Sequence, residues 1–156
     1  MNASLRHICT ILAADAGRRN QRIIFARSDK IPPVLGDKER IEQVIINIIS
    51  NSIKYTPEGG EIRVRSRADN TRAYIYVRDN GVGIPPEDIP HLFERFYRVE
   101  KSRTADAGGT GLGLAIAKEI VVAHGGEITI RSKVGHGTET IIILPLRTAL
   151  TNETGS

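Results

Sequence analysis

Apolar and polar positions recur along this chain with two different periods, one typical of helices and one typical of strands. From Ile41 to Tyr55 the apolar residues return every three or four positions, which predicts an amphipathic helix with Asp37 as its N-cap. Leu5 to Ala16 has mixed helical spacing, and Leu112 to His124 is a third such run that Gly125 is placed to end. We therefore expect three main helices.

Alternation with a period of two predicts the strands. They are expected at residues 21–26, 61–67, 73–78, 127–132 and 138–144. The breaker cluster Thr56 to Gly60 separates the second helix from the next strand, and Asp69-Asn70 marks the turn of a hairpin. This order of elements indicates an α+β fold, a two-layer sandwich with helices on one face of a mainly antiparallel mixed sheet.

Regular periodicity is lost from Asp79 to Gly113. Two glycine-rich segments bracket a stretch with Pro85, Pro86 and Pro90. A long irregular stretch inside a compact domain is usually functional or mobile, so we expect a mobile lid over about residues 86–110. Residues 148–156 are expected to form a disordered tail.

The composition narrows the functional classes. A chain of 156 residues suits one domain, and no apolar run is long enough to cross a bilayer. The single cysteine, Cys9, favours a reducing cytosolic compartment and a place in the core. The net charge of +4 suggests nucleic-acid binding, but the one tight basic cluster is Arg63, Arg65 and Arg67, which alternate on one strand face. We interpret this face as solvated and expect no nucleic-acid partner.

Three polar residues form a stripe on the second helix. Asn47, Asn51 and Lys54 lie at positions i, i+4 and i+7 of an otherwise apolar run. Two amide oxygens and an ammonium group on one helix face could bind a hydrated divalent cation and the phosphates that it carries.

Two glycine segments add further candidate chemistry. Asp79, ahead of Gly81 and Gly83, could accept from an exocyclic amino group and so select adenine, although Asp-Asn-Gly is also an ordinary turn sequence. The segment Gly108 to Leu114 leads into a helix and could bind phosphate or act as a hinge. It is not a P-loop, because no Gly-Lys-Ser/Thr ends it.

Five motifs in one order resemble those of bacterial sensor histidine kinases. They are similar to the N-box (Asn47 to Tyr55), the first glycine box (Asp79 to Gly83), the F-box (Phe93 to Arg98), the second glycine box (Gly109 to Leu114) and the closing G-x-G-T (Gly135 to Thr138). Together they cover roughly Asp37 to Leu146, so the chain resembles the catalytic, ATP-binding domain of these kinases.

The resemblance implies a Bergerat-type ATP-binding fold with ATP and Mg²⁺ as cofactors. Asn51 would be the principal Mg²⁺ ligand with Asn47 secondary, and Lys54 and Arg98 would act on the phosphates. Asp79 would take the adenine amino group, and Thr138 would support it through water. The implied ATP-binding residues are Asn47, Asn51, Lys54, Tyr55, Asp79, Gly81, Gly83, Ile84, Phe93, Tyr97, Arg98, Gly109, Thr110, Gly111, Leu112, Gly113, Leu114 and Thr138. The implied catalytic residues are Asn47, Lys54 and Arg98.

One substitution bears on the reaction. Gyrase-like members of the superfamily have a glutamate that activates water where this chain has Asn47. An amide cannot serve as a general base, so we expect slow attack by water and ATP kept for another acceptor.

The resemblance also implies what lies outside this chain. The phosphoacceptor histidine belongs to a separate helical-hairpin domain, and His7 has no acidic neighbour, so we expect a partly buried helix residue there. Residues 1–20 would be the remnant of that hairpin and linker, and 21–147 the catalytic domain. The chain alone is not expected to autophosphorylate. The implied partners are ATP, the protein's own dimerisation and phosphoacceptor domain, and a response regulator downstream.

We expect this chain to be a cytoplasmic domain that is monomeric by itself. The full-length protein is expected to be a homodimer attached to the inner membrane. An anti-sigma-factor serine kinase is an alternative. The lid of those kinases lacks a unit like Phe93 to Arg98 of this chain, so the sequence disfavours this alternative. Two further alternatives are a gyrase- or MutL-like ATPase, which Asn47 disfavours, and a degenerate nucleotide-binding module.

Overall fold

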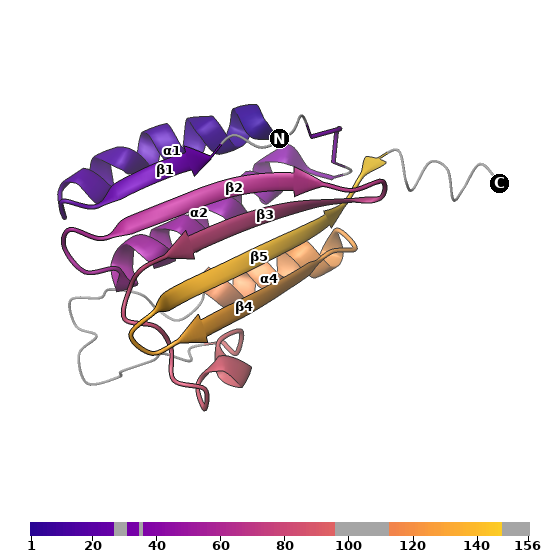
Figure 1. The fold of residues 1–156 in the computed structure, drawn as a ribbon. Helices are drawn as coiled ribbons and strands as arrows, with labels where there is room; N and C mark the ends of the chain where they lie inside the picture. The colour runs from indigo at the N-terminus through magenta and orange to yellow at the C-terminus, as the bar shows by residue number, and fades with distance from the viewer. Residues whose placement is uncertain (27–30, 35, 96–112, 148–156) are drawn as a thin grey trace.

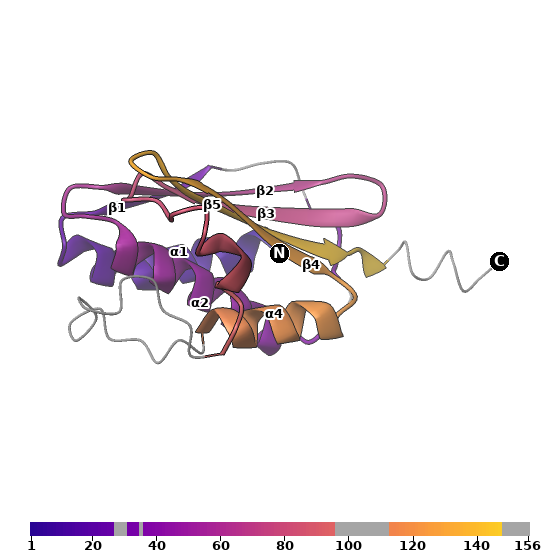
Figure 2. The ribbon, with the colours of Figure 1, turned by 90° about the horizontal axis from the view of Figure 1, so that it is seen from below.

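A five-stranded sheet and the helices on one of its faces form two layers (Figures 1 and 2). The computed structural model of the chain describes residues 1–26, 31–34, 36–95 and 113–147. The elements in chain order are α1 (Asn2–Gly17), β1 (Arg22–Ala26), α2 (Lys38–Tyr55), β2 (Glu61–Ala68), β3 (Arg72–Asp79), η1 (Ile89–His91), α4 (Gly113–Ala123), β4 (Glu127–Lys133) and β5 (Gly137–Pro145). The strand order is β1-β2-β3-β5-β4, with β1 parallel to β2 and the other pairs antiparallel. The predicted fold class is confirmed.

Helix α2 begins and ends where its sequence predicts. The Asp37 carboxylate accepts from the backbone N–H groups of Glu39, at 3.0 Å, and Arg40, at 3.4 Å, as an N-cap does. The helix ends at Tyr55, ahead of Pro57. Its apolar stripe, from Ile41 to Ile53, is buried against the sheet and the two neighbouring helices.

The β2–β3 hairpin is held at its turn by Asp69. One carboxylate oxygen accepts from the N–H groups of Thr71, at 2.8 Å, and Arg72, at 2.7 Å, and the other from the Tyr74 hydroxyl at 2.9 Å. These hydrogen bonds lower the pKa of Asp69 to about 2. The turn thus depends on an ionised carboxylate.

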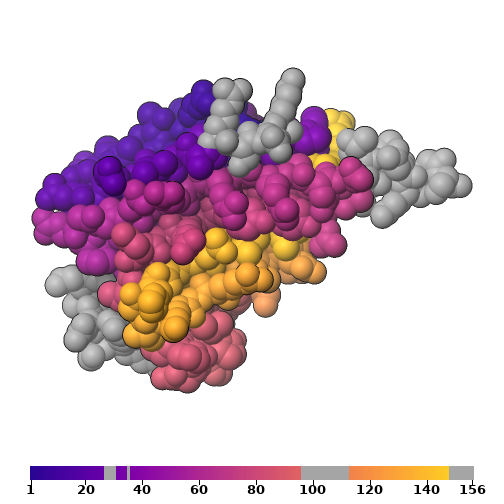
Figure 3. Space-filling view, in the orientation of Figure 1, coloured from indigo at the N-terminus to yellow at the C-terminus, as the bar shows by residue number. Residues whose placement is uncertain are grey.

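The outer face of the sheet carries the basic cluster. Strand side chains form this surface in the space-filling view (Figure 3), and Arg63, Arg65 and Arg67 are exposed there. The Arg65 guanidinium lies 4.1 Å from the centre of the Tyr76 ring on the neighbouring strand β3. The predicted exposure of this face is confirmed.

Helix α1 belongs to the same core as α2 and the sheet. Leu5 and Ala16 are fully buried, and Cys9, as predicted, is a core residue whose thiol pKa burial raises to about 11. The expected partial burial of His7 is wrong, because the buried stripe of α1 runs along the other side and leaves His7 exposed. The assignment of residues 1–20 to an upstream hairpin stays a prediction. None of the described helices is both long and apolar enough to cross a membrane.

Two side chains at the α1–β1 connection cap the carboxyl end of α2. Gln21, which is buried, donates through Nε2 to the carbonyl oxygens of Ile53, at 2.9 Å, and of Thr56. Arg19 donates to the carbonyl oxygens of Ile53, at 3.0 Å, and Lys54, at 3.3 Å. The carbonyl groups of Ile53 and Lys54, in the last turn of α2, thereby gain hydrogen-bond donors.

His124 connects the end of α4 to the start of α2. Its Nδ1 lies 2.7 Å from the Ile120 carbonyl oxygen, and its Nε2 lies 3.1 Å from the Asp37 backbone nitrogen. A carbonyl only accepts and an amide N–H only donates, so Nδ1 carries the proton. Gly36 permits this contact, because a Cβ there would lie 2.2 Å from the His124 ring.

Candidate functional site

A row of polar side chains crosses three strands on the helix-covered face of the sheet. Asp79 at the end of β3 is paired with Thr138 on β5, and Thr138 is paired with Ser132 on β4. Directly opposed residues point to the same face, and Val77, two positions before Asp79, is buried in the core. The three side chains therefore form one polar row beside the apolar core.

Asp79 is the buried charge of this row. It is 6 % exposed, and its Oδ1 accepts from the N–H groups of Gly81, at 2.9 Å, and Thr138, at 3.2 Å. The Ser52 hydroxyl of α2 also donates to the carboxylate. Burial raises the pKa of Asp79 above its ordinary value, and the three hydrogen bonds offset only part of that effect. The hydrogen bonds fix the carboxylate between the sheet and α2.

The backbone of β5 approaches β3 closely beside this carboxylate. Gly137 has φ +97°, and a Cβ at Gly137 would lie 2.0 Å from the Asp79 carbonyl oxygen. Only glycine meets both requirements here, since other residues rarely adopt such a φ. The motif glycine before Thr138 is therefore needed to bring Thr138 to Asp79.

Ser132 joins the other parts of the row. Its Oγ lies 2.8 Å from the Ile84 backbone nitrogen, 2.9 Å from the Gly137 carbonyl oxygen and 2.8 Å from Thr138 Oγ1. This one hydroxyl brings the segment after Gly83 to β5. The structure thus places Gly81 and Thr138 at Asp79, and Ile84 is linked to Thr138 through Ser132.

The predicted stripe lies on α2 at the edge of the same region. Asn47, Asn51 and Lys54 are all half-buried. The Asn47 amide nitrogen donates to the Gly113 carbonyl oxygen at 3.4 Å, so the stripe meets the first residue of α4. Tyr55, also half-buried, ends the helix, and its carbonyl oxygen faces Gly81. The N-box is therefore adjacent to both the first glycine box and the second.

The donor set of the stripe fits a magnesium ion that arrives with phosphates. Among the described residues, no group of three or more His, Cys, Asp or Glu side chains could hold a metal. Mg²⁺ is usually bound by one or two protein oxygens together with phosphates and water. The amide oxygens of Asn51 and Asn47 can supply such ligands.

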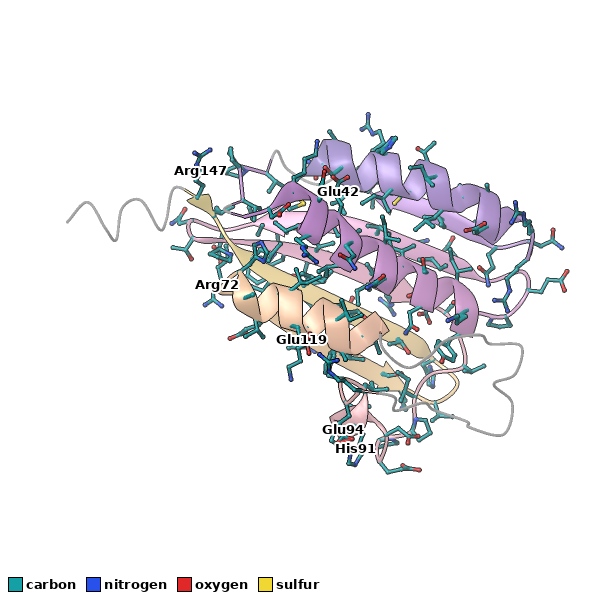
Figure 4. The ribbon with its side chains drawn as sticks, turned by 180° about the vertical axis from the view of Figure 1, so that it is seen from behind. Glu42, Arg72, His91, Glu94, Glu119 and Arg147 are labelled. Carbon is teal, nitrogen blue, oxygen red and sulfur yellow. The ribbon has the colours of Figure 1, made fainter. Side chains whose placement is uncertain are left out.

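The segment before residue 96 packs on α4. Phe93 is half-buried against the core, and the Lys118 ammonium lies 5.0 Å from the centre of its ring. Arg95 forms an ion pair with Glu119 of α4. In Figure 4, Glu119 lies on the side of α4 that is nearer to Glu94. Leu114 also packs against the core. Phe93, within the expected lid, and Leu114, just after it, thus both pack against the core.

Part of the predicted site lies outside the described residues. This holds for Tyr97, Arg98, Gly109, Thr110, Gly111 and Leu112. Their roles, and the lid from residue 96 onward, stay predictions.

Sequence reasoning missed two residues that hold the site together. Ser52 lies in the buried apolar stripe of α2, where helical periodicity assigns it no role, although a hydroxyl in such a stripe signals a polar partner. Ser132 carries no motif signal, because its role depends on which strands are paired. Both hydroxyls orient groups that the motifs do name.

Comparison with known proteins gives a consistent assignment. Residues 36–148 match the family described as histidine kinase-, DNA gyrase B- and HSP90-like ATPase. The sensor histidine kinase WalK of Bacillus subtilis is 47 % identical over 133 residues, which are 83 % of this chain and 22 % of WalK. The chain therefore spans about a fifth of the length of this relative.

Solved structures match at similar coverage of this chain. The catalytic domain of the histidine kinase ThkA superposes with a TM-score of 0.79 at 29 % identity, over 92 % of both chains. Full-length ShkA in complex with AMPPNP gives a TM-score of 0.82 at 28 % identity, over 92 % of this chain and 29 % of ShkA. The ThkA catalytic domain therefore matches this chain in length as well as in fold.

Proposed function

The chain belongs to the histidine kinase-, DNA gyrase B- and HSP90-like ATPase family as a sensor-kinase catalytic domain, and on this premise we propose its reaction. It binds Mg²⁺-ATP and donates the γ-phosphate to a histidine on a separate dimerisation and phosphoacceptor domain. The ATP-binding kinase domain is the part that the family establishes. The acceptor, the metal and the partners are the proposal.

Buried Asp79 is the observation that carries nucleotide binding. Its hydrogen bonds to Gly81, Thr138 and Ser52 fix one carboxylate at the base of the region between α2 and the strand ends. An ionised carboxylate is an acceptor only, which suits the amino group of adenine. Burial of a carboxylate is unfavourable for folding. Such buried, pKa-shifted groups are concentrated at functional sites, which supports a role for Asp79 in ligand binding.

The stripe supports binding of the phosphates. Bound Mg²⁺ would neutralise phosphate charge during the transfer. Asn51 would hold the metal, with Asn47 secondary. The half-buried Lys54 would contact the phosphates, and Tyr55, Gly83, Ile84 and Phe93 would surround the nucleotide. Arg98 and the second glycine box, Gly109 to Leu114, would complete the phosphate side.

Asn47 favours transfer to a protein acceptor over hydrolysis. Its amide donates to Gly113 and cannot take a proton from water. The proposed acceptor histidine lies on a domain outside this chain, with a response regulator as the next partner. The proposed setting is the cytoplasmic side of a membrane-attached homodimer.

The test combines binding and transfer. Calorimetry is expected to show ATP binding that Asp79→Asn weakens at least about tenfold, because a charge-assisted hydrogen bond is lost. Asp15→Asn, at an exposed position on α1, is the matched control and should leave affinity unchanged. With γ-labelled ATP the chain alone should gain no stable phosphate, and an added histidine-bearing hairpin domain should gain acid-labile phosphate.

Each alternative predicts a different result. Acid-stable phosphate on a serine of a partner would indicate a serine kinase, and steady ATP hydrolysis by the chain alone would indicate a gyrase- or MutL-like ATPase. Histidine phosphate on this chain alone would contradict the proposal, as would the absence of any nucleotide binding by the wild type.

A further inference from the structure

The Ser132 hydroxyl has three polar contacts and only one proton. Its Oγ lies 2.9 Å from the Gly137 carbonyl oxygen, which can only accept, and 2.8 Å from the Ile84 N–H group, which can only donate. The third contact, with the Thr138 hydroxyl at 2.8 Å, could run in either direction if it stood alone.

The two backbone contacts decide the direction of the third. If Ser132 gave its proton to Thr138, its oxygen would face the Gly137 oxygen at 2.9 Å with no proton between them. Every contact carries one proton only when Ser132 donates to Gly137 and Thr138 donates to Ser132. The Thr138 oxygen then keeps lone pairs and has no proton for a ligand.

We infer that Ser132 is a positioning residue that makes the Thr138 hydroxyl an acceptor only, and that it thereby contributes to selecting adenine over guanine. The inference rests on the proposed function and deepens it. Asp79 lies next to Thr138 in the same row and, when ionised, also only accepts. The row as a whole can receive N–H or water donors and can offer no hydroxyl proton to a ligand.

This polarity distinguishes the two purines. Adenine presents an amino group, which donates to such a row directly. Guanine presents a carbonyl oxygen at the same ring position, and an acceptor facing acceptors leaves polar groups unpaired. Removing the Ser132 hydroxyl would free the Thr138 proton and reduce the penalty against guanine.

The test measures the ratio of dissociation constants for GDP and ADP by calorimetry. Wild type is expected to favour ADP, and Ser132→Ala is expected to lower the ratio of the GDP constant to the ADP constant about tenfold. Ser132→Thr keeps a hydroxyl and should restore the wild-type ratio. A merely structural role would weaken both nucleotides together and leave the ratio unchanged, which would overturn the inference.

Thr138→Val provides a second measurement that does not depend on the folding of the Ser132 variant. It removes the hydroxyl that Ser132 orients and keeps the β-branched shape. It should also lower the ratio, and Ser132→Ala added to Thr138→Val should not change the ratio further. An unchanged ratio in Thr138→Val overturns the inference. Wild-type protein that binds neither nucleotide would instead reject the proposed function itself.

Discussion

Asp79 is a residue on which stability and binding make opposite demands. Asp79 is 6 % exposed and burial raises its pKa, so ionisation in the folded protein is less favourable than in water. The same ionised group is the acceptor that we assign to adenine. A neutral residue of the same shape should therefore help the fold and harm the site.

The pH dependence of stability tests this conflict. The ordinary pKa is 3.8 and the folded pKa is higher, so the protonated group favours folding, and this contribution is lost as pH rises through the folded pKa. Asp79→Asn has no such group. Its free energy of unfolding, relative to wild type, should rise with pH in that window and then stay level in urea denaturation.

Asp69→Asn is the matched control with the opposite sign. The pKa of Asp69 is lowered to about 2, so its contribution to stability is present above the ordinary value of 3.8 and is lost as pH falls through about 2. This variant should be less stable than wild type at neutral pH, and the difference should shrink in acid. A pH-independent difference for Asp79→Asn would contradict the raised pKa.

At the scale of elements, the sequence predicts features that depend on neighbouring residues and does not predict individual contacts between distant elements. The Asp37 cap, the Asp69 turn and the Gly125 helix end, where φ is +76°, act within a few residues, so the sequence alone predicts them. The contacts of Ser132 and Gln21 depend on which strands and helices meet. No local period encodes such a meeting, and both residues were missed as partners of site elements.

The contact between α4 and α2 through His124 is one of these tertiary features. Gln places a polar atom close to the position of Nε2 and can accept from the Asp37 N–H group, whereas the shorter Asn can reach only the Ile120 side. Both variants lose the ring. His124→Asn should therefore be less stable than His124→Gln by about 1 kcal/mol in thermal or urea unfolding. Equal stability of the two would show that the Asp37 contact contributes nothing.

At the scale of the whole molecule, α1 is a structural part of the domain. Its buried side chains join α2 and the sheet in one core, and the residues just after it cap α2. The amphipathic period of α1 predicted the helix, but the side that it buries depends on the neighbours it packs against. This is why the prediction for His7 was wrong.

A pair of substitutions on α1 measures this contribution. Leu5 is fully buried, and Leu5→Ala should reduce the free energy of unfolding by about 2 to 5 kcal/mol, because it removes apolar contacts and leaves a cavity. Ile11, on the same helix, is 56 % exposed, and Ile11→Ala should change it by no more than about 0.5 kcal/mol. Chemical denaturation distinguishes the two. Similar losses would mean that α1 does not pack as described.

The parallel pairing of β1 with β2 has a consequence for the order in which the chain folds during synthesis. Each residue of β1 pairs 39 positions further along, as Arg22 does with Glu61. A ribosome adding about 5 to 20 residues per second completes β2 roughly 2 to 8 s after β1. During that interval β1 has no partner strand, and the part of α2 that Gln21 caps has not been made. The nascent α1–β1 segment is therefore exposed to wrong pairing until β2 has been made.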